Sequence, residues 1–183
     1  MTEQEAIAAL RQGDINGLAL LVTRYQVKAI RAAYLIMRDE SAAQEVVQNA
    51  FLRVYERIEQ YDDKRPFAPW FFRIVSNDAI KAAQRQRREL SLETPTANGR
   101  SPLSDLLAAD FPEPDEQVTA VMLREQVWAA LGQLSPKQRA AIVMRYYLDM
   151  GETEMADRLH IARGTVKWHL HQARQRLHTL LTE

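Results

Sequence analysis

The sequence has 183 residues, no cysteine and a formal net charge of zero, and 46% of its residues are hydrophobic. This length allows one or two domains with their own cores, and the hydrophobic share excludes a disordered chain. The lack of cysteine excludes disulfides and thiolate metal sites.

No apolar run reaches the roughly 18 residues that a membrane span requires. The N-terminus, MTEQEAIAAL, is acidic and lacks the basic-then-apolar order of a signal peptide. We therefore expect a cytoplasmic protein with no membrane insertion of its own. The net charge is +2 over residues 1–90, −5 over 91–123 and +3 over 124–183. Two mildly basic blocks thus flank an acidic connector, a distribution that permits nucleic-acid binding.

The first part of the chain is predicted to be helical. Residues 2–37 contain a short and a longer helix, separated by a break at Gly13-Asp14. Asp39 to Ser41 is a start signal for a further helix over 41–60. The apolar positions of that helix are Val46, Val47, Ala50, Phe51, Val54, Tyr55 and Ile58. Its polar positions, either plain solvent contacts or a binding surface, are Gln44, Glu45, Gln48, Asn49 and Arg53.

Two prolines in the stretch from Tyr61 to Pro69 break this helix, and the next is predicted over Trp70 to Arg88. Four of its polar residues share one outer stripe, because they are spaced by four, four and three: Asn77, Lys81, Arg85 and Arg88. A basic stripe beside a loop with exposed aromatic residues, Tyr61 and Phe67, suits single-stranded nucleic acid. Core packing is the stronger interpretation of Trp70, Phe71 and Phe72, and we expect Trp70, Ile74 and Ala79 to face inward.

Residues 89–116 change in composition toward proline, serine, threonine and acidic residues. We interpret this stretch as an irregular linker with a short helical turn at 103–109. The helical pattern returns from Asp115, with core candidates Val118, Val121, Val127, Trp128, Leu131 and Leu134.

Ser135, Pro136 and Gln138 form a well-marked helix start: a serine cap, a proline in the first position and a glutamine in the third. This helix is predicted to end near Leu148, with Ile142 and one of Tyr146 and Tyr147 facing inward.

The stretch from Gly151 to Leu177 predicts two helices joined by a turn at His160 to Ala162. The second helix has an apolar face, Val166, Leu170, Ala173 and Leu177, opposite a polar one. A short helix, a tight turn and a second helix with a polar and basic outer face are typical of a DNA-binding helix-turn-helix, although an ordinary antiparallel helix pair has the same pattern.

The sequence contains no recognisable motif for catalysis or metal binding. There is no glycine-rich phosphate loop, no cofactor motif and no supported Ser-His-Asp set. His169 and His171 point about 200° apart on a helix and cannot easily share a metal. We therefore predict no enzyme activity, no cofactor and no metal.

In their order along the chain, three stretches resemble the bacterial extracytoplasmic-function sigma factors of the sigma-70 family. SAAQEVVQNAFLRVYERI is similar to the helix that docks on the clamp of RNA polymerase. PWFFRIVSNDAIKAAQRQRR is similar to the segment that melts and reads the −10 element. The region of these proteins that binds the −35 element as duplex is similar to the stretch LSPKQRAAIVMRYYLDMGETEMADRLHIARGTVKWHLHQARQRL.

This resemblance implies an all-α protein of two helical domains, region 2 over 1–90 and region 4, the helix-turn-helix, over 115–183, joined by a flexible acidic linker over 91–114. It also implies site residues. Those for core polymerase are Glu45, Gln48, Asn49, Leu52 and Arg53. Those for the −10 element are Tyr61, Asp62, Asp63, Lys64, Arg65, Phe67, Trp70, Asn77, Lys81, Arg85 and Arg88. Those for the −35 element are Arg163, Thr165, Lys167, Trp168, His169, His171, Gln172 and Arg174.

The function implied is a promoter-specificity subunit without catalysis of its own, with core RNA polymerase, promoter DNA and an anti-sigma factor as partners. The alternative is an independent DNA-binding regulator of the response-regulator type. That class requires a receiver domain of alternating strands and helices, and residues 1–90 show no strand periodicity.

Overall fold

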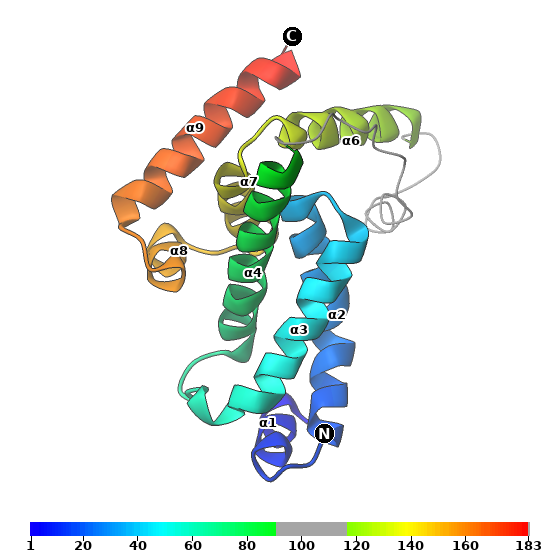
Figure 1. The fold of residues 1–183 in the computed structure, drawn as a ribbon, viewed down its shortest axis with the longest axis vertical. Coiled ribbons are helices and arrows are strands. Elements are labelled where there is room, and N and C mark those ends of the chain that lie inside the picture. Colours follow the sequence, from blue (N-terminus) through cyan, green and yellow to red (C-terminus); the bar gives the residue numbers. More distant parts are fainter. Residues whose placement is uncertain (91–116, 183) are drawn as a thin grey trace. The chain divides into compact units, whose positions relative to one another are not determined.

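The computed structural model describes residues 1–90 and 117–182 (Figure 1). Every regular element in these two ranges is a helix, which confirms the predicted all-α class. The predicted linker over 91–114, with its helical turn at 103–109, lies outside the described residues. The chain divides into two compact units, Met1–Ala82 and Ala83–Glu183. The boundary between the units falls inside a helix, so it does not test the predicted domain limits at 90 and 115. These limits remain predictions.

The first unit is built from helices whose starts are capped by short polar side chains. Thr2 caps the first helix in a reciprocal capping box with Glu5. The Asp39 carboxylate accepts the backbone N–H of Ala42 at 2.9 Å, at the predicted start of the third helix. The elements are α1 (Glu3–Arg11), α2 (Asn16–Met37), α3 (Glu40–Arg57), the 3₁₀ turn η1 (Ile58–Gln60) and α4 (Phe67–Leu90).

Aromatic rings from α2, α3 and α4 form the core of this unit. The rings of Phe51 and Phe71 stack with centroids 4.6 Å apart, and Tyr25 lies 5.4 Å from Phe67. Phe67 and Phe71 are fully buried, and Tyr61 is only 6% exposed. The prediction that Tyr61 and Phe67 are exposed is therefore wrong.

The error has a structural cause, because α4 begins at Phe67 rather than at Trp70. Pro69 then lies in the first turn of the helix, where backbone N–H groups have no intrahelical acceptor and a proline is tolerated. This start places Phe67, Phe71 and Val75 on the buried face, with Phe72 and Ala79 also buried. The predicted inward residues Trp70 and Ile74 are only half-buried. Among the apolar positions of α3, Val46 is half-buried and Tyr55 is exposed.

The second unit places three helices against a fourth. The elements are α6 (Gln117–Gly132), α7 (Pro136–Ile142), the π-helical segment η4 (Val143–Tyr147), α8 (Glu152–Leu159) and α9 (Arg163–Thr182). Helices α6, α7 and α8 each pack against α9. Ser135 and Gln138 form the predicted capping box, with bonds of 3.3 and 2.9 Å. Of the apolar face predicted on α9, Val166, Leu170 and Ala173 are buried and Leu177 is half-buried.

Two further core predictions in this unit are corrected. Val121 and Val127 are exposed, because α6 carries apolar residues around its whole circumference. Among the side chains of α6 from residue 121 on, Ala130 and Leu131 are buried, as is Leu134 beyond its end. Trp128 is half-buried, and the side chain of Val118 is outside the described part.

The helix after Ser135 also differs from its prediction, because it ends at Ile142 and continues as η4. There the Leu148 N–H reaches the Val143 carbonyl at 3.0 Å, one residue beyond the α-helical partner. The extra residue per turn directs Val143 and Met144 inward and leaves Tyr146 61% exposed. Ile142 and Tyr147, the other predicted inward residues, are half-buried.

Gly17, near the start of α2, allows α1 to approach α2 closely. A Cβ atom at this position would lie 2.2 Å from the backbone oxygen of Ala6 in α1. We expect Gly17→Ala to lower the free energy of unfolding by about 1–3 kcal/mol, because backbone atoms of α1 would have to move. Denaturant unfolding of the full chain followed by circular dichroism measures this change.

Gly151→Ser is the matched control, because a Cβ at Gly151 meets nothing within 4 Å and serine is a preferred residue at a helix N-cap. This variant should not lose stability. A Gly17→Ala protein as stable as the wild type would contradict the close approach of α1 and α2.

Candidate nucleic-acid interface

Helices α8 and α9 form the predicted helix-turn-helix, with the turn at the predicted residues. His160 ends α8 in the left-handed backbone region (φ 52°), and its N–H bonds to the carbonyl of Ala156. The Ile161 N–H reaches the same carbonyl at 3.1 Å. This tight cap redirects the chain within three residues, so that α9 starts at Arg163 and packs against α8.

The outward face of α9 is polar around one large aromatic ring. Trp168 is 56% exposed, on the side of the helix opposite the buried Val166 and Leu170. Of the other residues predicted for this surface, Gln172 is half-buried, and those exposed are Arg163, Thr165, Lys167, His171 and Arg174. A rigid helix with one face packed and the other lined by hydrogen-bonding groups fits the width of a DNA major groove.

Two of the three basic residues on α9 that were predicted to contact DNA have partners within the protein. Arg163 lies 3.7 Å from the Glu152 carboxylate of α8. The Nε of Arg174 donates to the Tyr146 hydroxyl at 2.9 Å, and its guanidinium lies 5.8 Å from the ring centroid. Tyr146 was predicted as a possible core residue, so its contact with Arg174 was not anticipated from the sequence. Lys167, between the two arginines along the helix, is exposed.

His169 lies on the flank of α9 rather than on its outward face. It is half-buried, and its Nδ1 atom is buried with no hydrogen-bond partner in the described ranges. Burial lowers the pKa of His169, and the positive charge of Lys137 on α7 lowers it further. Its position between α9 and α7 favours a packing role. No cluster of three potential metal ligands occurs among the described residues.

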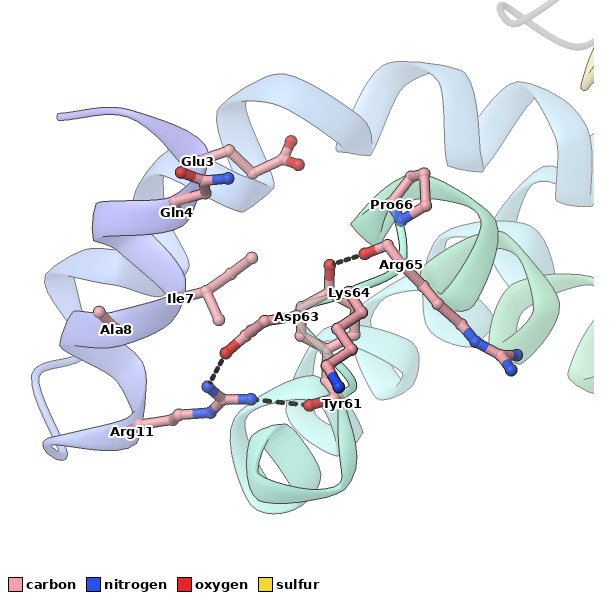
Figure 2. A pocket seen from close by; sticks show the side chains of 10 residues that line it. All are labelled: Glu3, Gln4, Ile7, Ala8, Arg11, Tyr61, Asp63, Lys64, Arg65 and Pro66. Carbon is pink, nitrogen blue, oxygen red and sulfur yellow. Dashed lines mark hydrogen bonds and ion pairs between the residues drawn. The ribbon is translucent and has the colours of Figure 1, made fainter.

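In the first unit, the loop between η1 and α4 is held in a defined turn by its own side chains (Figure 2). The Asp62 carboxylate accepts the N–H of Lys64 at 3.0 Å, and the Asp62 carbonyl accepts the N–H of Arg65 at 3.0 Å. The buried Tyr61 donates its hydroxyl to the Arg65 carbonyl, and burial raises the pKa of this tyrosine. Residues 62–66 remain exposed, so the loop offers polar and charged groups in a fixed arrangement.

The correction at Tyr61 and Phe67 changes which rings in this region can stack on a base. Both have their faces inside the core, where Phe67 lies 5.6 Å from Tyr61. Trp70 packs on the same pair, at 5.3 Å from Tyr61, but it is only half-buried. Trp70 is therefore the aromatic residue of the predicted −10 set that retains an accessible surface.

The predicted polar stripe follows α4 away from this loop. Asn77 is half-buried, and Lys81, Arg85 and Arg88 are exposed. Arg85 lies 3.9 Å from Glu89 on the next turn, a solvent-exposed pair that contributes little to stability. The stripe thus provides an amide nearly three turns into α4 and cations further along the same helix.

The outer face of α3 is a third candidate surface. Glu45, Gln48, Asn49 and Leu52 are exposed and follow one another at helical spacing, opposite the buried Val47. Leu52, the apolar member of this stripe, is 56% exposed. Arg53 is turned to the side, where it forms an ion pair with Asp78 of α4 at 2.5 Å. Arg53 therefore joins two helices, which its sequence position did not indicate.

Comparison with known proteins finds a matching sequence profile in each half of the chain. Residues 21–89 match the sequence profile of Sigma-70 region 2, and residues 124–177 match that of Sigma-70, region 4. The ECF RNA polymerase sigma factor SigL of Mycobacterium tuberculosis is 32% identical over 97% of this chain and 92% of its own length. The RNA polymerase sigma factor CnrH of Cupriavidus metallidurans is 30% identical over 95% and 91%.

Among solved structures, CnrH in complex with the cytosolic domain of CnrY superposes with a TM-score of 0.66 at 23% identity. The match covers 98% of this chain and 97% of that one.

A membrane-spanning helix is not found among the described residues, because each helix there is too short or too polar for a span.

Proposed function

The chain belongs to the extracytoplasmic-function group of the sigma-70 family, and on this basis we propose that it directs RNA polymerase to promoters by reading two DNA elements. The −35 element is read as duplex by α9. The −10 element is captured as single strand by the loop at 62–66 and by α4. The chain has no catalytic step of its own in this proposal, and it acts in the cytoplasm where the polymerase works.

The observation that carries the proposal is the outward face of α9. Lys167 and Arg174 lie along one flank, where cations reach phosphates, and Gln172 has an amide that can pair with an adenine edge. Trp168 adds an apolar surface in the middle of this face, suited to a thymine methyl group. The contact between Arg174 and Tyr146 supports a phosphate role, because it orients the guanidinium along the flank.

The −10 role rests on the fixed loop and the residues behind it. Moving a base out of the helical stack costs a few kcal/mol of free energy, which binding in a pocket and attraction by charged neighbours can offset. The turn built on Asp62 presents backbone and side-chain groups of residues 63–66 in one arrangement, and Asn77 supplies an amide that both donates and accepts. Because Tyr61 and Phe67 are buried, Trp70 is the stacking surface in this proposal.

Core RNA polymerase is proposed to bind the exposed stripe of α3. Leu52 and the exposed Tyr55 next to it on the helix, with polar residues around them, have the composition of an interface centre, an apolar anchor with a polar rim. An anti-sigma factor is the further partner proposed, because two similar structures are complexes of this kind: CnrH with the cytosolic domain of CnrY, and the sigma factor RpoE with the anti-sigma factor NepR from Bartonella quintana. A response-regulator function is not favoured, since the family assignment covers both units.

Replacing the apolar anchor of α3 tests the polymerase contact. We expect Leu52→Glu to weaken binding to core RNA polymerase by about tenfold, because interface anchors typically contribute more than 1 kcal/mol. Val27→Glu is the matched control, since Val27 on α2 is exposed to nearly the same extent, 54% against 56%. If both variants bind labelled core enzyme equally well in a titration, the exposed stripe of α3 is not part of the interface.

Replacing Lys167 tests the reading of the −35 element. Lys167→Ala should weaken promoter binding by the holoenzyme and lower the slope of log affinity against log salt by about one, as expected for one lost phosphate contact. Arg176→Ala is the control, because Arg176 is also exposed on α9 but lies about half a turn around the helix from Lys167. An unchanged salt slope in Lys167→Ala would contradict the assignment of this flank to the DNA backbone.

Replacing Asn77 tests base capture at the −10 element. The full chain is titrated with two fluorescent single-stranded oligonucleotides, the non-template −10 sequence of a promoter that its holoenzyme uses and a scrambled version. Asn77→Ala should remove the difference in affinity between them and retain weak, salt-sensitive binding to both. Gln26→Ala, which removes an exposed amide from α2, should keep the difference. Equal binding of both oligonucleotides by the wild type would refute base capture.

A further inference from the structure

Helix α1 and the loop at 61–66 face each other across a cavity of about 490 Å³ (Figure 2). From α1 the cavity is lined by Glu3, Gln4, Ile7, Ala8 and Arg11, and from the loop by Tyr61, Asp63, Lys64, Arg65 and Pro66. No role was predicted for α1 from the sequence, and α1 has no part in the proposed function. The contacts across this cavity nevertheless concern the same loop that is proposed to read the −10 element.

Arg11 joins the two sides through both ends of its guanidinium. Nη1 donates to the Asp63 carboxylate, and Nη2 donates to the Tyr61 carbonyl at 2.7 Å. The hydrogen bond to Asp63 raises the pKa of Arg11. The planar guanidinium presents its donors in a rigid fork, which suits it to hold a side chain and a backbone group of one loop at the same time.

The loop is tied to the protein at a second, independent place. The Tyr61 ring packs against Phe67 and Trp70 in the core, and its hydroxyl donates to the Arg65 carbonyl. The core thus fixes the two ends of the loop. Within the loop Asp62 holds the turn, and Arg11 adds the contact from α1 to the middle of the loop, at Asp63, whose side chain is otherwise exposed to solvent.

Helix α1 is itself held firmly enough to serve as a support. The Tyr25 hydroxyl of α2 donates to the Glu3 carboxylate. Arg24 also lies 3.5 Å from this carboxylate, but its side chain is 59% exposed, and such a pair contributes little to stability. Burial raises the pKa of Tyr25, so the hydroxyl keeps the proton that it donates. The capping box at Thr2 closes the first turn, and Gly17 allows the close approach to α2. These contacts distinguish α1 from the frayed ends typical of chain termini.

We propose that α1 is a positioning element for reading the −10 element, and that the fork of Arg11 holds the loop at 61–66 in the arrangement that discriminates between bases. This inference rests on the proposed function of the loop. Arg11 is a positioning residue in this role: it acts through Asp63 and the Tyr61 carbonyl rather than by touching DNA. Base discrimination requires donors and acceptors in fixed places, whereas attraction of the DNA backbone does not.

The test measures the ratio of affinities of the full chain for the −10 oligonucleotide and its scrambled version. In Arg11→Met we expect this ratio to fall by about tenfold, with little change in affinity for the scrambled strand. Arg11→Lys keeps the charge but replaces the planar fork, with its two separated donor nitrogens, by a single nitrogen, so its ratio should also fall. The matched control is Arg24→Met, which removes a cation that contacts α1 but not the loop, and its ratio should stay at the wild-type value.

Hydrogen exchange of the Lys64 and Arg65 amides, both bonded to Asp62, gives a second readout that needs no DNA. Exchange should be faster in Arg11→Met than in Arg24→Met, and circular dichroism shows whether each variant is folded. A wild-type ratio of affinities in Arg11→Met, or a full restoration of the ratio by lysine, would overturn the positioning role and leave the proposed function standing. A wild-type chain that does not discriminate between the oligonucleotides would refute both.

Discussion

The stack of Phe51 on Phe71, with Phe67 and Tyr25 around it, determines how the first unit is arranged. Each ring comes from a different helix or a different turn, so their contact fixes α2, α3 and α4 against one another. The same cluster ends at Tyr61, whose ring packs on Phe67. The loop with the proposed −10 residues thus begins directly on the core, and the outward stripe of α3 is set by burial of its opposite side. Both surfaces depend on one group of aromatic side chains.

Local sequence signals predicted where helices begin and failed where helices change geometry. The Asp39 and Ser135 starts were visible because a side-chain oxygen caps the backbone within three residues. The start of α4 at Phe67 was missed because two prolines suggested a loop, whereas Pro69 fits the first turn of a helix. The segment η4 was missed because a π turn depends on packing and has no simple residue pattern. Of the two tyrosines that were candidates for the inward position, Tyr146 is exposed.

For the candidate surfaces, the sequence indicated which residues are polar and on which helical face they lie, and the structure added their partners. Arg53 bonds to Asp78, Arg174 to Tyr146 and Arg11 to Asp63. Each of these pairs joins residues at least 25 positions apart. Such contacts depend on how helices pack, so no local pattern could reveal them. Arg11 was missed for this reason, because it is one basic residue at the end of a short helix until the fold brings the loop beside it.

The π-helical turn between α7 and α8 is a place where the length of the chain can change by one residue. An α-helical residue turns the chain by about 100°, whereas the wider π turn accommodates one more residue in nearly the same rotation. Loss of one residue within Val143–Tyr147 that restores a regular helical turn would therefore leave α8 and α9 in nearly the same orientation. The same deletion in the regular helix α7 would rotate both by about 100°. Evolution can thus lengthen or shorten this unit by one residue at η4 without turning the outward face of α9.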